Sequence, residues 1–284
     1  MKSKLSGIAL VLFLTGAATA QTAHPAPGCN NRDFVGAYGM FATGTILQVP
    51  LNAVPTGPFT RVGRVVVDGN GNVSVNNTAS YDGNIVTESY SGTYTVRADC
   101  SLTINVLVSL AALGNVPFAF TGALSNKGDN AAVVVCGIGA PCSAAPTGAV
   151  LRVLLARQSV FSQWPCATWN LAGSFAVDMS GSVITTNGPI PFARDGIVTF
   201  DGRGGFTGHD TVNTGIAAPA TETLAGTYSV DSSCQITINY SLGGAHVWTG
   251  MLTNQSDSAD LIVAETGVVI SGTLMRIGGG FGPF

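Results

Sequence analysis

Two glutamates at matching places in the chain are the residues whose type and spacing best suit chemistry. Glu88 and Glu222 each stand six residues before a tyrosine, Tyr94 and Tyr228. Side chains on a strand alternate between its two faces, so each glutamate shares a face with its tyrosine. A carboxylate on an apolar face is desolvated, which disfavours its charged form. Such a group could act as a general acid or base, or as a polar anchor for a ligand.

Two arginines near the ends of the two halves, Arg152 and Arg276, are expected to supply the opposing charge. With Glu88 and Glu222 they are the groups predicted to orient a ligand. The further residues predicted to bind it are Tyr94, Tyr228, His246 and Trp248. The structural alternative is an ion pair between each glutamate and an arginine, or a carboxylate in water at the rim of the fold.

The histidines are weaker candidates. His209-Asp210 invites a catalytic interpretation, but no serine lies in a Gly-x-Ser-x-Gly elbow, so a solvated turn histidine is favoured. His246 and Trp248 are expected to line an apolar surface in the second half rather than bind a metal. No Cys-x-x-Cys or paired histidine motif is present, and we expect neither a metal nor a cofactor.

These residues are positioned by an internal repeat. Residues 87–105 and 221–239 align without a gap and are identical at ten of nineteen positions. Each copy alternates as a half-buried antiparallel hairpin does, and further short strands with Gly-rich turns flank it. The sequence predicts an all-β protein of two tandem antiparallel up-and-down β-barrels with about eight strands each. Their predicted ranges are 21–160 and 161–284.

The six cysteines follow the same repeat, which suggests how they pair. Cys29 and Cys166 each stand seven residues before a glycine at the first strand of a copy, and Cys100 and Cys234 occupy one position in the two hairpins. We therefore predict three disulfides, which are Cys29 with Cys100, Cys166 with Cys234, and Cys136 with Cys142.

The N-terminus indicates export. Residues 1–20 combine a basic start, an apolar run and a small-x-small site, as secretory signal peptides do. Without Lys2 and Lys4, ten basic residues remain against fifteen acidic ones, and no basic cluster is present to bind nucleic acid. An outer-membrane barrel is disfavoured by the low aromatic content of 8% and by the six cysteines. The expected location is secreted or periplasmic, without membrane insertion.

Residues at the first and last strands of each copy resemble the lipocalin and wider calycin pattern. Gly36-Ala37-Tyr38 with Arg152, and Gly173-Ser174-Phe175 with Arg276, are similar to the Gly-x-aromatic opening and the final-strand arginine that packs on its ring. The family's usual tryptophan is replaced by tyrosine or phenylalanine. The resemblance implies a barrel that forms a cup for an apolar small molecule.

The function that we expect is non-catalytic binding of an apolar small molecule in a barrel lumen. One alternative is an extracellular structural or adhesive protein with filled barrels, whose loops make contacts that include self-association. Another is a barrel enzyme of isomerase or cyclase type with an inward carboxylate. A large lumen favours the carrier, a filled lumen favours the structural protein, and an inward unpaired carboxylate favours the enzyme.

Overall fold

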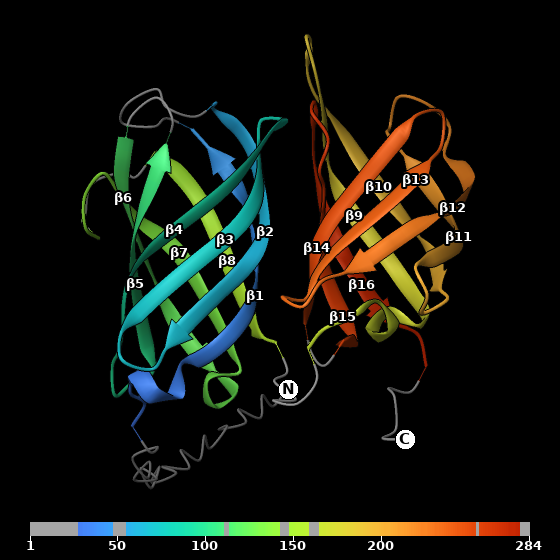
Figure 1. The fold of residues 1–284 in the computed structure, drawn as a ribbon. Helices are drawn as coiled ribbons and strands as arrows, with labels where there is room; N and C mark the ends of the chain where they lie inside the picture. Colours follow the sequence, from blue (N-terminus) through green and yellow to red (C-terminus); the bar gives the residue numbers. More distant parts are fainter. Residues whose placement is uncertain are drawn as a thin grey trace, which may run out of the picture.

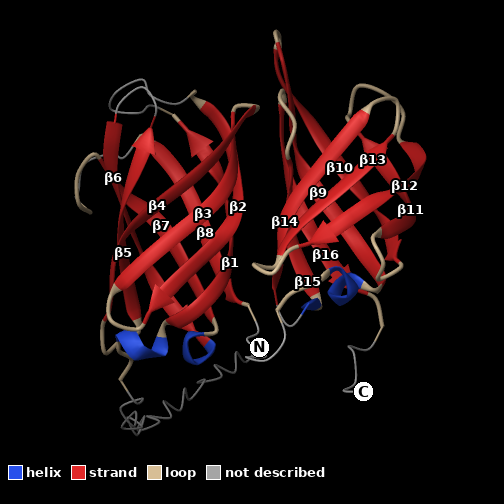
Figure 2. Cartoon of the chain, viewed as in Figure 1, coloured by secondary structure: helices blue, strands red, loops and turns tan. Residues whose placement is uncertain are grey.

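The chain forms two closed antiparallel barrels that stand side by side (Figure 1). The structure is a computed structural model and describes residues 28–47, 55–110, 114–142, 148–158, 165–253 and 256–278. Strands dominate, and the described helices are three short 3-10 turns (Figure 2). No helix among the described residues is long and apolar enough to span a bilayer. The predicted signal peptide, residues 1–20, lies outside the described residues.

Barrel one contains strands β1 to β8, and each strand pairs with the next along the chain. Closure comes from β1 pairing with β8, where Tyr38 lies opposite Arg157 and Ile46 opposite Ala149. The inward side chains form one apolar cluster, as alternation predicts. The strands are β1 (Val35–Ile46), β2 (Gly57–Asp68), β3 (Asn72–Tyr81), β4 (Asn84–Val96), β5 (Ser101–Leu110), β6 (Gly114–Ser125), β7 (Asn130–Ile138) and β8 (Ala149–Arg157).

Barrel two repeats this topology and closes through the pairing of its first and last strands. It has a separate apolar core. The predicted fold class is thus confirmed, while the boundary between the domains stays a prediction because residues 159–164 are outside the described ranges. The strands are β9 (Gly173–Thr185), β10 (Gly188–Phe200), β11 (Gly205–Asn213), β12 (Ala220–Val230), β13 (Gln235–Ser241), β14 (Ala245–Thr253), β15 (Ser258–Val263) and β16 (Val268–Arg276).

The base of barrel one is closed by the 3-10 turn η1 (Asn31–Asp33) and by an arginine across an aromatic ring. The guanidinium of Arg157 lies 5.0 Å from the centre of the Tyr38 ring. It also donates to the carbonyl of Val35 and, at 3.1 Å, to that of Gly128. Gly36 has φ of +111°, and a Cβ there would lie 3.3 Å from the same guanidinium, so glycine suits this position.

This arrangement corrects the expectation for Arg152. Arg152 lies on β8 but is exposed on the outer face, whereas Arg157, five residues later, packs on the ring. Strand alternation puts residues 152 and 157 on opposite faces, so a slip of five residues in aligning the last strands selected the wrong arginine.

In barrel two the predicted arginine, Arg276, does pack on the aromatic ring of the first strand. Arg276 lies opposite Phe175 in the β16–β9 ladder, with its guanidinium 4.5 Å from the ring centre. It donates to the carbonyls of Ala172 at 2.6 Å and Asn170 at 3.1 Å, beside the 3-10 turn η3 (Thr168–Leu171). The bases of the two barrels therefore share one construction.

The three predicted disulfides are confirmed. Cys29–Cys100 and Cys166–Cys234 tie each base to the central hairpin of its barrel, over separations of 71 and 68 residues. Cys136–Cys142 closes a short loop after β7, which barrel two lacks. Three disulfides suit an oxidising compartment.

The barrels meet through the outer face of β2 and the strands β14 to β16. Val62 of barrel one packs with Met251 and Ile262 of barrel two. The peptide N–H of Gly267 donates to the carbonyl of Gly83 at 2.8 Å, and the Ser80 hydroxyl donates to the carbonyl of Val268 at 2.7 Å. The two halves thus form an apolar contact with hydrogen bonds at its edge.

Candidate functional site

Inside barrel one, Glu88 forms an ion pair, but its partner is Arg61 and not Arg152. The Nη2 atom of Arg61 lies 2.6 Å from Oε2 of Glu88. Two phenols complete the shell: Tyr81 donates to Oε1 of Glu88 at 2.8 Å, and Arg61 Nη1 donates to the Tyr90 hydroxyl at 2.7 Å. Burial raises the pKa of both tyrosines, which therefore stay protonated. The pair is neutral and enclosed.

Barrel two has an ion pair at the equivalent positions of the repeat, again with a partner that was not predicted. Arg194 Nη2 lies 2.8 Å from Oε2 of Glu222, and Arg276 is at the base instead. A second carboxylate joins this pair, because Arg194 Nε lies 3.0 Å from Oδ2 of Asp210. Tyr240 is the phenol of this cluster, and its hydroxyl accepts from Arg194 Nη1 at 2.8 Å.

The two carboxylates of barrel two differ in their surroundings. The side chain of Asp210 has no solvent exposure, whereas 25% of the Glu222 side chain is exposed. Neither oxygen of Asp210 accepts a hydrogen bond from a described residue. Burial raises the pKa of Asp210; the Arg194 charge lowers it in part, and the Glu222 charge adds to the rise. His209-Asp210 is thus on strand β11 and not in a turn; His209 is exposed, as expected, and Asp210 points inward.

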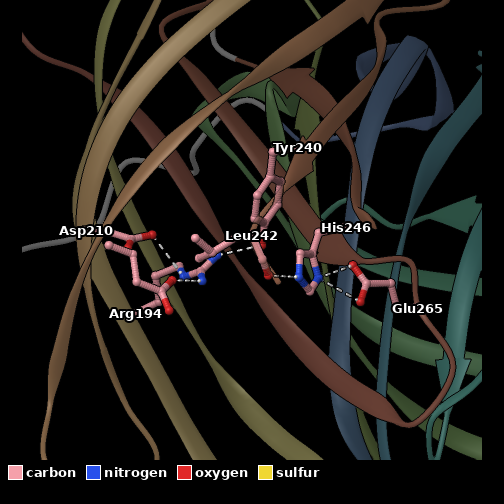
Figure 3. Close-up of polar contacts among 7 residues, drawn as sticks. Arg194, Asp210, Tyr240, Leu242, His246 and Glu265 are labelled. Carbon is pink, nitrogen blue, oxygen red and sulfur yellow. Dashed lines mark hydrogen bonds and ion pairs between the residues drawn. The ribbon is translucent and has the colours of Figure 1, made fainter. Parts of the chain in front are cut away.

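The polar side chains of barrel two continue from this cluster to His246. The rings of Tyr240 and His246 stack, with centroids 4.9 Å apart. Nδ1 of His246 lies 3.1 Å from the carboxylate of Glu265, and Nε2 lies 3.0 Å from the carbonyl oxygen of Leu242. Figure 3 shows these groups in one row from Asp210 and Arg194 to Glu265. The predicted ligand residue His246 therefore has polar partners, beside a fully buried Trp248.

The remaining predicted site residues, Tyr94 and Tyr228, are at the bases of the barrels. The Tyr94 hydroxyl donates to the carbonyl of Phe34 at 2.7 Å, and the Tyr228 hydroxyl donates to that of Thr168 at 3.1 Å. These bonds tie β4 of barrel one and β12 of barrel two to the segments that close the bases. The geometry therefore places both tyrosines apart from the Arg–Glu clusters.

Sequence reasoning missed Arg61, Arg194 and Asn77 and did not place Asp210 inside the barrel, although the repeat contains a signal for these four residues. Arg61 and Arg194 each stand seven residues before the turn aspartates Asp68 and Asp201, and each begins an Arg-x-Gly motif. Asn77 and Asp210 each stand nine residues after those aspartates. Aligning the repeat from its turns would have found them.

The glycine of each Arg-x-Gly motif makes room for the inward side chain on the next strand, which is Asn77 in barrel one and Asp210 in barrel two. A Cβ on Gly63 would lie 2.4 Å from Cβ of Asn77, and a Cβ on Gly196 would lie 2.4 Å from Cβ of Asp210. Any larger residue would force the strands apart. The position across from the glycine is thus equivalent in the two barrels, but it is an amide in one and a carboxylate in the other.

Two small cavities lie inside barrel one, and Arg61 lines both. The cavity towards the mouth, the end opposite η1, has a volume of about 20 Å³ and includes Phe59, Phe118 and Ala149 in its lining. The one towards the base has about 30 Å³ and is lined mainly by aliphatic side chains such as Met40 and Val65. Each is large enough for only one or two water molecules. Among the described residues no group of three metal-ligating side chains occurs.

Comparisons with known proteins add little to this geometry. No protein-family model and no curated protein matches the chain. A DUF3598 family protein of unknown function from Nostoc punctiforme PCC 73102 aligns with 87% of this chain and 98% of its own, at 10% identity and a TM-score of 0.26. CghA aligns with 91% and 97%, also at 10% identity and 0.26. Likeness at this level supports no argument about fold or function.

Proposed function

We propose that the chain is a secreted or periplasmic binding protein that takes a small apolar molecule through the mouth of barrel one. The observation that supports this most directly is the apolar cavity near the mouth, above a neutralised ion pair. The three disulfides and the predicted signal peptide are consistent with the location. A barrel closed at one end, with an apolar cavity towards the other, has the form of a cup for a ligand.

The lining of the mouth cavity fits an apolar guest. Its side chains include Phe59, Phe118 and Phe120, and its one charged group, Arg61, is already paired with Glu88. Because the cavity is only about 20 Å³, a guest larger than water enters when Phe118 and Phe120 change rotamer. Phe118 is only partly buried, so its displacement disturbs the core little.

A neutral fluorescent dye, N-phenyl-1-naphthylamine, tests the proposal with the full mature chain. We expect its emission to rise on binding. Ala149→Phe puts a ring into the mouth cavity and should strongly weaken binding, whereas Val150→Phe puts the same ring on the outer face of the same strand, where Val150 is 68% exposed. If the wild type fails to bind the dye, or if the two variants bind it equally, this proposal is wrong.

The small cavity volumes favour one other candidate, the structural or adhesive protein with filled barrels. In that case the core of barrel one should exclude the dye altogether. Light scattering would then reveal concentration-dependent assembly of the mature protein. A monomer that binds the dye speaks against this candidate.

A further inference from the structure

We propose that the polar cluster of barrel two is a second binding site, which takes a small organic cation such as a primary ammonium ion. This site differs from the apolar mouth of barrel one in place and in ligand chemistry, and it does not depend on the function proposed for barrel one. Its central residues are Asp210, Glu222 and Arg194.

The first argument is a charge balance inside the barrel. Asp210 and Glu222 share one guanidinium, that of Arg194, so one negative charge remains when both carboxylates are ionised. Barrel one has no such excess, since Asn77 stands where barrel two has Asp210. An unbalanced charge in a desolvated site favours uptake of a proton or of another cation.

The second argument is that Asp210 has unused hydrogen-bonding capacity. Asp210 as a whole is 1% exposed, and neither of its carboxylate oxygens accepts a hydrogen bond from a described residue. A carboxylate has about four acceptor positions, and buried acceptors normally have partners. Asp210 already has the Arg194 charge at 3.0 Å, which it shares with Glu222, and an ammonium group would add three hydrogen-bond donors and a second positive charge.

The third argument is access. In barrel one, Tyr81 and Tyr90 cover the ion pair, and the Glu88 side chain is only 5% exposed. In barrel two the position equivalent to Tyr90 is Leu224, whose side chain cannot accept a hydrogen bond from the arginine, and 25% of the Glu222 side chain is exposed. A cation can therefore reach the cluster past Glu222.

Other charged and aromatic groups around the cluster fit this ligand class. Tyr240 and Trp248 face Arg194, with the guanidinium 5.7 Å and 5.5 Å from their ring centres, so aromatic rings border the cluster. Further along, Glu265 pairs with His246, which adds a carboxylate on the same side. His209, the neighbour of Asp210 on β11, is on the outer face.

Binding should be linked to a proton. Burial raises the pKa of Asp210, and an ammonium ion competes with that proton for the same carboxylate. Affinity should therefore fall as the pH is lowered and Asp210 becomes protonated. At a pH where Asp210 is partly protonated, binding should release protons, and the calorimetric heat should then depend on the ionisation enthalpy of the buffer.

Titration calorimetry of the mature protein with 2-phenylethylammonium chloride tests the site, and 2-phenylethanol serves as the neutral probe of nearly equal shape. We expect the ammonium to bind more tightly than the alcohol. Asp210→Asn, which creates the side chain that barrel one tolerates at this position, should weaken ammonium binding about tenfold or more. Asp195→Asn removes the same charge from the outer face next to Arg194 and should change affinity less than about twofold.

Several outcomes would overturn the inference. These are equal binding of the ammonium and the alcohol, no binding of either, or full ammonium affinity in Asp210→Asn. The comparison of the two probes uses the wild type, so it decides the matter even if Asp210→Asn is poorly folded. Glu222→Gln provides a second variant that should weaken the ammonium and leave dye binding at barrel one unchanged.

Discussion

The two barrels share one frame and differ in how that frame is completed. Each has a Gly-x-aromatic opening with an arginine across the ring, a disulfide at the base, and an inward Arg–Glu pair. Barrel one encloses its pair with two tyrosines and the neutral Asn77. Barrel two leaves its pair partly open and adds Asp210. The features that close a barrel are thus common to both, whereas the residues around the ion pair differ.

The largest expected effect separates the two ion pairs. Glu88→Gln leaves Arg61 buried without a countercharge and should destabilise barrel one by about 3–5 kcal/mol. Glu222→Gln leaves Arg194 paired with Asp210 and should cost less than about 1 kcal/mol. Trp169 and Trp248 belong to barrel two, so tryptophan fluorescence during urea unfolding reports mainly on barrel two, and circular dichroism reports on both. Equal losses in the two variants would contradict the difference between the clusters.

The disulfides test the shared frame. In the chain-entropy model, a bridge over about 70 residues stabilises by about 4 kcal/mol, and one that closes a loop of six residues stabilises by about 2 kcal/mol. Replacing Cys29 and Cys100 by alanine should therefore cost barrel one about as much as replacing Cys166 and Cys234 costs barrel two. Replacing Cys136 and Cys142 should cost barrel one less stability than replacing Cys29 and Cys100. Thermal unfolding of the three double variants measures this order.

The pH dependence of stability should reveal a feature of the outer face of barrel two. Burial raises the pKa of Asp260 on β15 to about 6, on the face that carries Ile262 towards barrel one. Because the pKa in the unfolded chain is about 4, the folded state holds the proton more tightly. This contribution is complete below pH 4 and is lost as the pH rises through 6, by about 3 kcal/mol.

Asp260→Asn should remove that loss between pH 4 and pH 7, as urea unfolding at several pH values would show. In barrel one the turn residue Asp68 should act in the opposite sense. Hydrogen bonds from Asn72 lower the pKa of Asp68 to about 2, so its contribution is lost as the pH falls from 4 towards 2. A wild-type profile that is flat from pH 4 to pH 7 would contradict the prediction for Asp260.

The smallest expected effect distinguishes the two arginines of β8. Arg157→Ala removes hydrogen bonds to backbone carbonyls and the contact with Tyr38, which should cost about 1–2 kcal/mol. Arg152→Ala changes an exposed side chain and should stay within about 0.5 kcal/mol. Arg276→Ala should behave like Arg157→Ala. If Arg152→Ala is the more harmful of the pair in β8, the assignment of the base arginine is wrong.

Much of the fold could be predicted because it depends on local and periodic signals. Alternation, turn glycines and the repeat predicted both barrels, and equivalent positions of Cys100 and Cys234 predicted the disulfides. The inward direction of Glu88 and Glu222 followed from the same alternation. Arg276 was identified correctly by its place near the end of the repeat. Arg152 was not, because β7 is longer than β15 and is followed by a longer loop, which shifts the alignment of the last strands.

The sequence by itself determined the strands, the inward faces and the cysteine pairs, since these depend on a period of two and on spacing along the chain. Only the tertiary structure decided that Arg61 and Arg194 are the partners of the two glutamates. Those partners lie two strands away, and strand register and barrel closure determine which side chains meet across the lumen. The same closure buries Asp210, whose carboxylate accepts no hydrogen bond from the described residues. The local sequence around His209 could not indicate this burial.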